Sequence, residues 1–301
     1  MHVSTVPGRT LAVLGCLTLA ACAGSTTTEP GSAGSLRAQL PRAVRDAGVL
    51  RIATDLNYPP VDFKQPDGTP AGLDIDLARA LGSHLGLRVE FTDLPFEKVL
   101  PAVRERRVDL AVSAVLDTRQ RQQGLDDQGR TTDSGVDFVD YFVTGTSILV
   151  RRGNPAGIGS LDDLCGQTVA LQRGTVQDEI AQRQTAACTK AGKPLTIRRT
   201  DTDQQALAEV AAGRAVADLN DYPVAEYNTR DGQGGGRFQV TGGQFLTSPY
   251  GIALAKDSTA LRDVLAKALD QLIRNGEYDR ILERWGVPGG AVSSAVVNGG
   301  R

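Results

Sequence analysis

The sequence predicts an α/β fold with mainly parallel β-sheets, because signals for strands and helices alternate along most of the chain. Residues 49–54 form an apolar, β-prone run, and an amphipathic helix pattern begins near Asp74. Residues 87–91 alternate as a strand, 96–106 favour a helix, and 108–113 favour a buried strand. Three strands joined by two helical connections form a βαβαβ unit, whose strands pair in parallel through right-handed crossovers.

The helix near Asp74 is recognised by its spacing, since Leu77, Leu81 and Leu85 fall on one face and Gly86 provides a stop. The same criteria predict a second α/β unit in the rest of the chain. Its strands are predicted at residues 146–151, 168–171, 195–198, 215–219 and 250–255. Its helices are predicted after Gly174-Thr175, over 203–212, from Asp221 onward, over 261–276 and over 278–285.

The sequence that leads to Cys22 predicts the cellular location of the protein. An apolar stretch over residues 11–19 follows Arg9 and leads to the sequence Leu19-Ala20-Ala21-Cys22. It is shorter than the roughly 20 apolar residues that span a bilayer, so residues 1–21 are predicted to be an export signal. The run resembles the lipobox of bacterial lipoproteins, which implies that Cys22 is lipidated; the alternative is an ordinary signal with a chance cysteine. We expect an extracytoplasmic protein that this lipid alone anchors to the cell membrane.

Both ends of the exported chain are predicted to lack order. Residues 22–45 begin with a run of Gly, Ser, Thr and Ala that buries little apolar surface, which favours a flexible tether. Residues 289–301 are rich in Gly, Ala and Ser and are predicted to form a disordered tail. Roughly 240 residues remain to fold, enough for one large domain or two small ones.

Cysteine and histidine usage limits the possible chemistry. Of 4 cysteines, Cys16 leaves with the signal and Cys22 is assigned to lipid. In an oxidising compartment the remaining pair, Cys165 and Cys188, is predicted to form a disulfide. His84 is the single histidine beyond the signal, and we expect no metal site and no cofactor. A net charge of −2 without a basic run gives no reason to expect nucleic acid as a partner.

Polar residues gather just beyond the ends of predicted strands, where α/β sheets bind ligands. Asp55, Ser113 and Asp221 follow or close such strands, and Arg121 lies shortly after one. Gly174-Thr175 opens a helix whose N–H groups suit an anion.

Each candidate also has a structural interpretation. Asp55 suits a turn, Asp221 a helix N-cap and Arg121 a solvated surface. Tyr58 and Phe96 suit a hydrophobic core. The sequence contains no Gly-x-Ser-x-Gly, phosphate loop or dinucleotide-binding glycine motif, so no catalytic centre is predicted.

Several short segments of the sequence indicate a protein family when they are taken together in their order along the chain. The segments are Ala53-Thr54-Asp55-Leu56-Asn57-Tyr58-Pro59-Pro60, Gly72-Leu73-Asp74-Ile75-Asp76-Leu77-Ala78, Thr118-Arg119-Gln120-Arg121, Val136-Asp137-Phe138, Gly174-Thr175-Val176-Gln177, Asn220-Asp221-Tyr222-Pro223-Val224-Ala225, Pro249-Tyr250-Gly251-Ile252-Ala253, Asn275-Gly276-Glu277-Tyr278-Asp279 and Trp285. In this order, over residues 49–287, the chain resembles the family 3 extracytoplasmic solute-binding proteins of bacterial amino-acid ABC importers.

The resemblance implies a two-lobed, type II periplasmic-binding-protein fold in which each lobe is a mainly parallel sheet flanked by helices. Residues 46–143 and 249–288 would form lobe 1, residues 144–248 would form lobe 2, and two crossing strands would act as the hinge. The implied function is to capture an amino acid between the lobes and deliver it to the permease subunits of an ABC importer in the membrane. The resemblance implies a monomer that is not an enzyme.

By the same resemblance, Arg121 receives the α-carboxylate of the ligand, which its planar fork of donors suits. The N–H groups of Thr175, Val176 and Gln177 share that carboxylate from the other lobe. Asp221 accepts the α-ammonium group, so both charges of the zwitterion meet opposite charges.

The resemblance implies that Ser113 supports either the carboxylate or the ammonium end of the ligand. The residues implied to line the side-chain pocket are Asp55, Tyr58 and Phe96. Asp55 favours a polar or cationic amino acid as the ligand. The alternatives are a quaternary amine or modified amino acid, and a sensor that feeds a signalling partner. A dehydratase-like enzyme on the same fold is disfavoured, because no candidate acid beyond Asp55 is present.

The sequence departs from the family pattern around the site. Leu116 and Ala114 stand where hydroxyl residues are common, and Val61 and Val176 replace a common Phe and Thr. An additional segment, residues 124–135, follows Arg121. These departures predict a pocket that is more apolar than usual.

Overall fold

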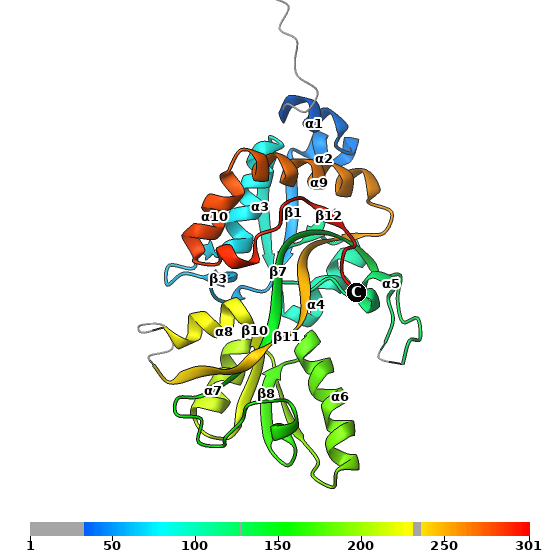
Figure 1. The fold of residues 1–301 in the computed structure, drawn as a ribbon. Coiled ribbons are helices and arrows are strands. Elements are labelled where there is room, and N and C mark those ends of the chain that lie inside the picture. Colours follow the sequence, from blue (N-terminus) through cyan, green and yellow to red (C-terminus); the bar gives the residue numbers. More distant parts are fainter. Residues whose placement is uncertain (1–32, 127, 231–235) are drawn as a thin grey trace, which may run out of the picture.

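Two long antiparallel strands, β7 (Val136–Arg151) and β11 (Phe238–Ala255), run through both halves of the molecule (Figure 1). The structure is a computed structural model that describes residues 33–126, 128–230 and 236–301. Neighbouring strands pair in the order β5-β1-β6-β11-β7-β10-β8-β9, so the two lobes share one continuous sheet. The predicted lobe boundaries at 143 and 248 fall inside β7 and β11, the two strands that cross between the lobes.

Lobe 1 is built on β1 (Val49–Thr54), which pairs in parallel with β5 (Arg88–Asp93) and β6 (Leu110–Ala111). Its helices are α3 (Leu73–His84), α4 (Phe96–Arg104), α5 (Arg119–Gln123), α9 (Thr259–Arg274) and α10 (Glu277–Trp285). A small sheet contains β2 (Asn57–Tyr58), β3 (Asp62–Lys64) and β4 (Pro70–Ala71). The apolar stripe of α9, including Leu261, Leu265 and Leu272, is buried in the lobe 1 core as its spacing predicts.

Lobe 2 has the parallel strands β8 (Thr168–Gln172), β9 (Thr196–Thr200) and β10 (Ala217–Asp221), and β10 joins β7 in antiparallel pairing. Its helices are α6 (Val176–Lys190), α7 (Asp203–Ala211), α8 (Tyr222–Thr229) and the short 3₁₀ turn η1 (Asp162–Leu164). The predicted α/β fold with mainly parallel sheets in two lobes is confirmed.

The strands that cross between the lobes were predicted too short. The apolar runs at 146–151 and 250–255 mark only one half of β7 and of β11. The other half of β7 alternates less clearly because nearly every residue from 136 to 150 is buried on both faces.

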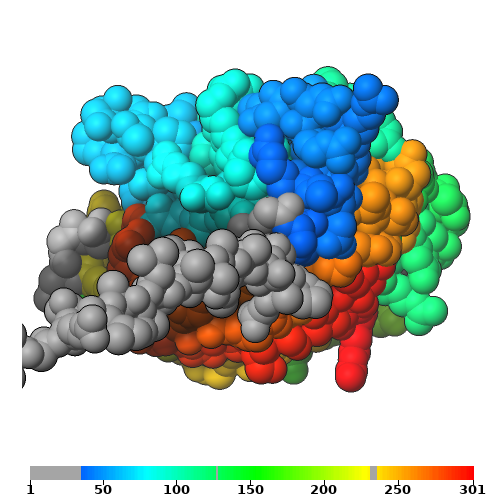
Figure 2. Space-filling model, turned by 90° about the horizontal axis from the view of Figure 1, so that it is seen from above, coloured from blue at the N-terminus to red at the C-terminus, as the bar shows by residue number. Residues whose placement is uncertain are grey.

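The predicted tether over residues 22–45 is wrong in its second half. Helices α1 (Ala33–Gln39) and α2 (Arg42–Ala47) form there, and Leu36 and Leu40 are buried in the core of lobe 1. The blue α1–α2 segment lies against the orange helix α9 (Figure 2). Burial of these two leucines, four residues apart, outweighs the weak helix signal of the surrounding sequence. The predicted signal over 1–21, the lipidated Cys22 and the rest of the tether lie outside the described residues.

The prediction of a disordered tail over residues 289–301 is also wrong. After the turn η2 (Pro288–Gly290), strand β12 (Val296–Val297) pairs antiparallel with β7. The Ala295 N–H also donates to Asp270 at 2.8 Å. Main-chain pairing with an available strand edge orders this segment, although its composition carries no strand signal.

Cys165 and Cys188 form the predicted disulfide, with their Cα atoms 5.0 Å apart. The bond joins the segment after η1 to the buried face of α6. Within the described ranges, no helix combines the length and apolar character needed to cross a membrane.

We predict that the Cys165→Ala/Cys188→Ala double variant loses about 3 kcal/mol of unfolding free energy, because the disulfide closes a loop of this size in the unfolded chain. Urea denaturation followed by circular dichroism measures the change. A thiol reductant should destabilise the native protein and leave the variant unaffected. Equal unfolding midpoints for the native and variant proteins would contradict this expectation.

Candidate ligand-binding site

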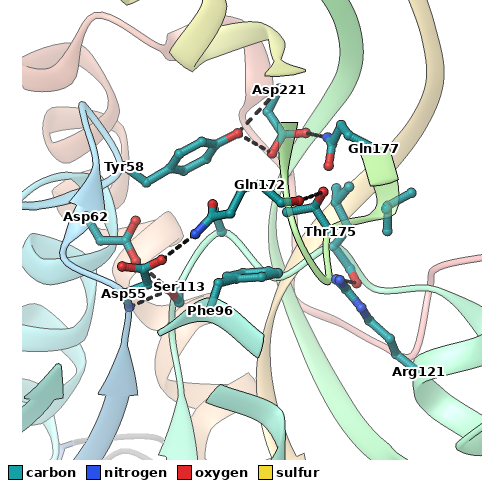
Figure 3. A pocket seen from close by; sticks show the side chains of 13 residues that line it. Asp55, Tyr58, Asp62, Phe96, Ser113, Arg121, Gln172, Thr175, Gln177 and Asp221 are labelled. Atoms are coloured by element: carbon teal, nitrogen blue, oxygen red, sulfur yellow. Dashed lines mark hydrogen bonds between the residues drawn. The ribbon is translucent and has the colours of Figure 1, made fainter. Parts of the chain in front are cut away.

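A cavity lined by residues of both lobes lies in the cleft between them. All nine residues predicted to bind the ligand line it. The lining is Asp55, Tyr58, Asp62, Phe96, Ser113, Ala114, Leu116 and Arg121 from lobe 1 and Gln172, Thr175, Val176, Gln177 and Asp221 from lobe 2. Figure 3 shows Arg121 and Asp221 toward one side and Asp55 and Asp62 at the opposite end.

Two carboxyl groups from lobe 1 form an acidic end of the cavity. Asp55 follows β1, and its Oδ1 and Oδ2 accept hydrogen bonds from Asn57 and Gln172, both at 2.7 Å. Asp62 lies on β3, and its Oδ2 accepts from Thr54 at 2.8 Å and from Ser113 at 2.6 Å. The other oxygen of Asp62 is buried without a hydrogen-bond partner among the described residues.

Burial raises the pKa of both carboxyl groups in the acidic end. For Asp55 the hydrogen bonds from Asn57 and Gln172 partly oppose this rise. For Asp62, the negative charge on Asp74 adds to burial, and the pKa rises well above its ordinary value. A cation in the cavity would therefore favour the ionised form of both groups.

Ser113 contacts both residues of the acidic end. Its Oγ accepts the Asp55 N–H at 2.9 Å while it donates to Asp62. Asp62 was not predicted as a site residue. The signal that could have identified it is a lone acidic residue in the otherwise apolar Val61-Asp62-Phe63 run.

Arg121 reaches the cavity from the short helix α5, which Thr118 caps by accepting the Arg121 N–H at 3.3 Å. Its guanidinium group donates to the Leu116 carbonyl oxygen at 2.9 Å and, across the cleft, to the Gly174 carbonyl oxygen at 3.2 Å. The same group lies 5.6 Å from the centre of the Phe96 ring, within cation–π range. Desolvation lowers the pKa of Arg121, and the charges of Glu179, Asp221 and Asp117 oppose that change.

Asp221 ends β10 at the start of α8, but its side chain makes no capping hydrogen bond. The carboxylate faces the cavity and accepts from Gln177 at 2.8 Å and from the Tyr58 hydroxyl at 3.0 Å. Burial raises its pKa to about 6, and these hydrogen bonds limit the rise. The position therefore has a different use from the N-cap that local sequence also allowed.

The start of α6 presents backbone donors beside Arg121. Thr175 caps the helix by accepting the Asp178 N–H at 3.1 Å, and its hydroxyl donates to the Gln172 carbonyl oxygen at 2.8 Å. The first N–H groups of a helix have no partner within it, so those of Val176 and Gln177 suit an anion.

Gln172 was not predicted, although it ends β8 as Asp221 ends β10. Its side chain extends between Tyr58 and Phe96 in Figure 3. The amide donates across the cleft to Asp55 and also to the Asp201 carbonyl oxygen at 3.2 Å.

Hydrogen bonds that cross the cleft hold the lobes together. The Tyr58 hydroxyl lies within hydrogen-bond distance of both Asn220 and Asp221, in addition to the bonds from Gln172 to Asp55 and from Arg121 to Gly174. The cavity lining contains opposite charges at defined positions but no histidine, cysteine or lysine. This arrangement can bind a charged small molecule.

The family model for bacterial extracellular solute-binding proteins, family 3, matches residues 50–288. The chain belongs to this family. Arginine-binding protein ArgT of Corynebacterium glutamicum is 30% identical over 272 residues, which cover 89% of this chain and 84% of that relative. The family identification agrees with the resemblance found in the ordered segments and with an extracellular or periplasmic place of action.

Solved structures agree with this identification. An ancestral arginine-binding protein bound to arginine is 31% identical, with a TM-score of 0.70, over 79% of this chain and 98% of that chain. The ancestral amino acid-binding protein AncCDT-1, described as a precursor of cyclohexadienyl dehydratase, is also 31% identical, with a TM-score of 0.69. It is matched over 81% of this chain and 97% of its own. These names describe binding proteins for arginine or amino acids.

Proposed function

We propose that this solute-binding protein captures L-arginine or a closely related cationic amino acid and delivers it to the permease of an ABC importer. The observation that supports this most directly is the distribution of charge in the cavity. Arg121 and Asp221 approach one side of it, and Asp55 and Asp62 form an acidic end on the other. A cationic α-amino acid carries complementary charges in the same order.

The backbone end of the ligand is bound by charges from both lobes. Arg121 and the N–H groups of Val176 and Gln177 take the α-carboxylate, because a guanidinium fork and a helix start both favour this anion. Asp221 accepts from the α-ammonium group. Binding a zwitterion here leaves neither charge buried and unpaired.

The side chain of the ligand extends toward Asp55 between Tyr58 and Phe96. In the structure, the neutral Gln172 amide donates to Asp55. A cationic group forms a stronger, charge-assisted hydrogen bond to the same carboxylate. The second carboxyl group, Asp62, has an unpartnered buried oxygen that adds to the preference for positive charge.

The same geometry disfavours a quaternary amine. Such a nitrogen carries no N–H, so it would leave Asp221 without the hydrogen bonds that an α-ammonium group provides. The matched family and its relative ArgT are binding proteins, which supports a role in which the ligand is released unchanged.

We predict that the native protein binds L-arginine at least about thirtyfold more tightly than L-citrulline, whose side chain has a similar shape but no charge. Asp55→Asn should reduce this ratio by about tenfold or more, because it removes the carboxylate that meets the cation. Isothermal titration calorimetry with both amino acids measures the ratio. Asp257→Asn, at an exposed carboxyl group remote from the cavity, is the matched control. Equal affinities of the native protein for the two amino acids would rule out the cationic preference.

We further predict that Arg121→Ala and Asp221→Ala each weaken L-arginine binding by about thirtyfold to several-thousandfold, since loss of one partner from a buried charge pair costs about 2–5 kcal/mol. Calorimetry measures binding, and circular dichroism verifies folding. The controls are Arg42→Ala and Asp46→Ala, which break an exposed ion pair with 88% and 58% of the two side chains accessible. The zwitterion model fails if either site variant keeps near-native affinity.

The proposed lipoprotein status rests on the sequence Leu19-Ala20-Ala21-Cys22. Cells that express the full chain should incorporate labelled fatty acid into the native protein and not into Cys22→Ala, because the cysteine thiol is the attachment point. Autoradiography of the purified proteins gives the result. Cys16→Ala, a second cysteine within the signal, should still be labelled. Equal labelling of native protein and Cys22→Ala would refute the anchor.

A further inference from the structure

The segment after residue 288 lies outside the family match, which covers residues 50–288. It nevertheless returns to the part of lobe 1 that carries Arg121. In Figure 1 the red C-terminal segment crosses β7 and its end lies beside α5. We call residues 296–301 the strap.

The strap is attached to lobe 1 through main-chain and side-chain hydrogen bonds. Val296 and Val297 pair with Asp140 and Val139 of β7. Asn298 then exchanges two hydrogen bonds with the backbone of Phe138, at 2.8 and 3.2 Å. These contacts fix the register of the strap, so the position of its last residues is determined by β7.

The last residues of the strap contact two aspartates from different segments. The Gly299 N–H donates to Asp140 at 2.9 Å, and the Gly300 N–H donates to Asp117 at 2.8 Å. Burial and then the charge on Asp117 raise the pKa of Asp140 to about 8. The hydrogen bonds from the Gly299 and Gly300 N–H groups oppose the rise in the pKa of Asp140 and of Asp117, respectively.

Asp117 connects the strap to the short helix α5, which holds Arg121. It lies between Leu116, whose carbonyl oxygen accepts from the Arg121 guanidinium group, and Thr118, which caps α5. Gln122, the residue after Arg121, donates to Asp117 at 2.8 Å and to the Gly300 carbonyl oxygen at 3.2 Å.

The fit at Gly300 is too close for a side chain. A Cβ atom at this residue would lie 2.0 Å from the backbone oxygen of Asp117. Gly289, at the start of the same C-terminal segment, has no atom within 4 Å of the corresponding position. The same substitution at the two glycines therefore separates strap contact from a general effect on the C-terminal segment.

We propose that the strap is a positioning element for the ligand carboxylate site: through Asp117 and Gln122 it holds α5 so that Arg121 faces the cleft. This inference rests on the proposed function of Arg121. It assigns a role in binding to a segment beyond the part of the chain that the family shares.

We expect Gly300→Ala, and deletion of residues 296–301, to weaken L-arginine binding about three- to thirtyfold in calorimetry, the scale of coupling between connected residues. Gly289→Ala should bind as the native protein does. Unchanged affinity in both strap variants would overturn the proposal.

A double-mutant cycle distinguishes an effect on the position of Arg121 from a general loosening of the fold. The effect of Gly300→Ala should persist at full size in the Asp221→Asn background and fall below about twofold in the Arg121→Lys background, where the bidentate contact is already lost. An equal loss in both backgrounds would mean that the strap acts on the whole fold, which contradicts the proposal.

Hydrogen exchange gives a readout that does not depend on the ligand. In the deletion variant, the amides of Arg121 and Gln122 should exchange faster than in the native protein, while amides of α6 in lobe 2 stay unchanged. Unaltered exchange at α5 would overturn the proposal. If the native protein failed to bind L-arginine, the proposed function would be wrong, and the exchange result would still decide whether the strap holds α5.

Discussion

Buried carboxyl groups without a cationic partner are the constraint on which the binding site depends. Asp55, Asp62 and Asp221 are 2%, 0% and 4% exposed, whereas the ion pairs among the described residues involve other carboxylates, mostly at the surface. Burial favours the protonated form of such groups unless a positive charge arrives. The cavity is therefore complementary to a molecule that brings positive charge to two places.

Cross-lobe hydrogen bonds from neutral donors satisfy carboxyl groups of the cavity. Gln172 and Tyr58 satisfy oxygen atoms on the opposite lobe with neutral donors. Under the proposed function, a cationic ligand replaces the Gln172 amide at Asp55 and forms a stronger, charge-assisted hydrogen bond. The pairing of β7 with β11 is irregular between Thr241 and Gly251, where the strands pass between lobes. Such irregularities bend and twist strands locally at the crossing between the lobes.

Features that depend on residues close together in the sequence could be predicted, whereas features that depend on distant contacts could not. Helix α9 could be predicted because its buried residues recur at helical spacing, and Arg121 and Asp221 because they follow strands and lie in specific segments. Asp62 could not be predicted as a site residue, since its position depends on the hydroxyl groups of Thr54 and Ser113, which only the fold brings together. The sequence gives equally little sign of β12, because edge pairing of two residues depends on a strand more than 150 positions away.

Arg121 shows how a short element can hold a charged group in place. Helix α5 has 5 residues, far fewer than the roughly 12–15 at which an isolated helix becomes even marginally stable. Its position must therefore come from its neighbours. On one side the Asp117 N–H donates to the Pro249 carbonyl oxygen of β11 at 2.8 Å. On the other, the Leu125 N–H donates to the Gln120 carbonyl oxygen of α5 at 2.9 Å. The strap closes the remaining side through Gly300. The additional segment and the strap therefore both contact the helix that carries Arg121.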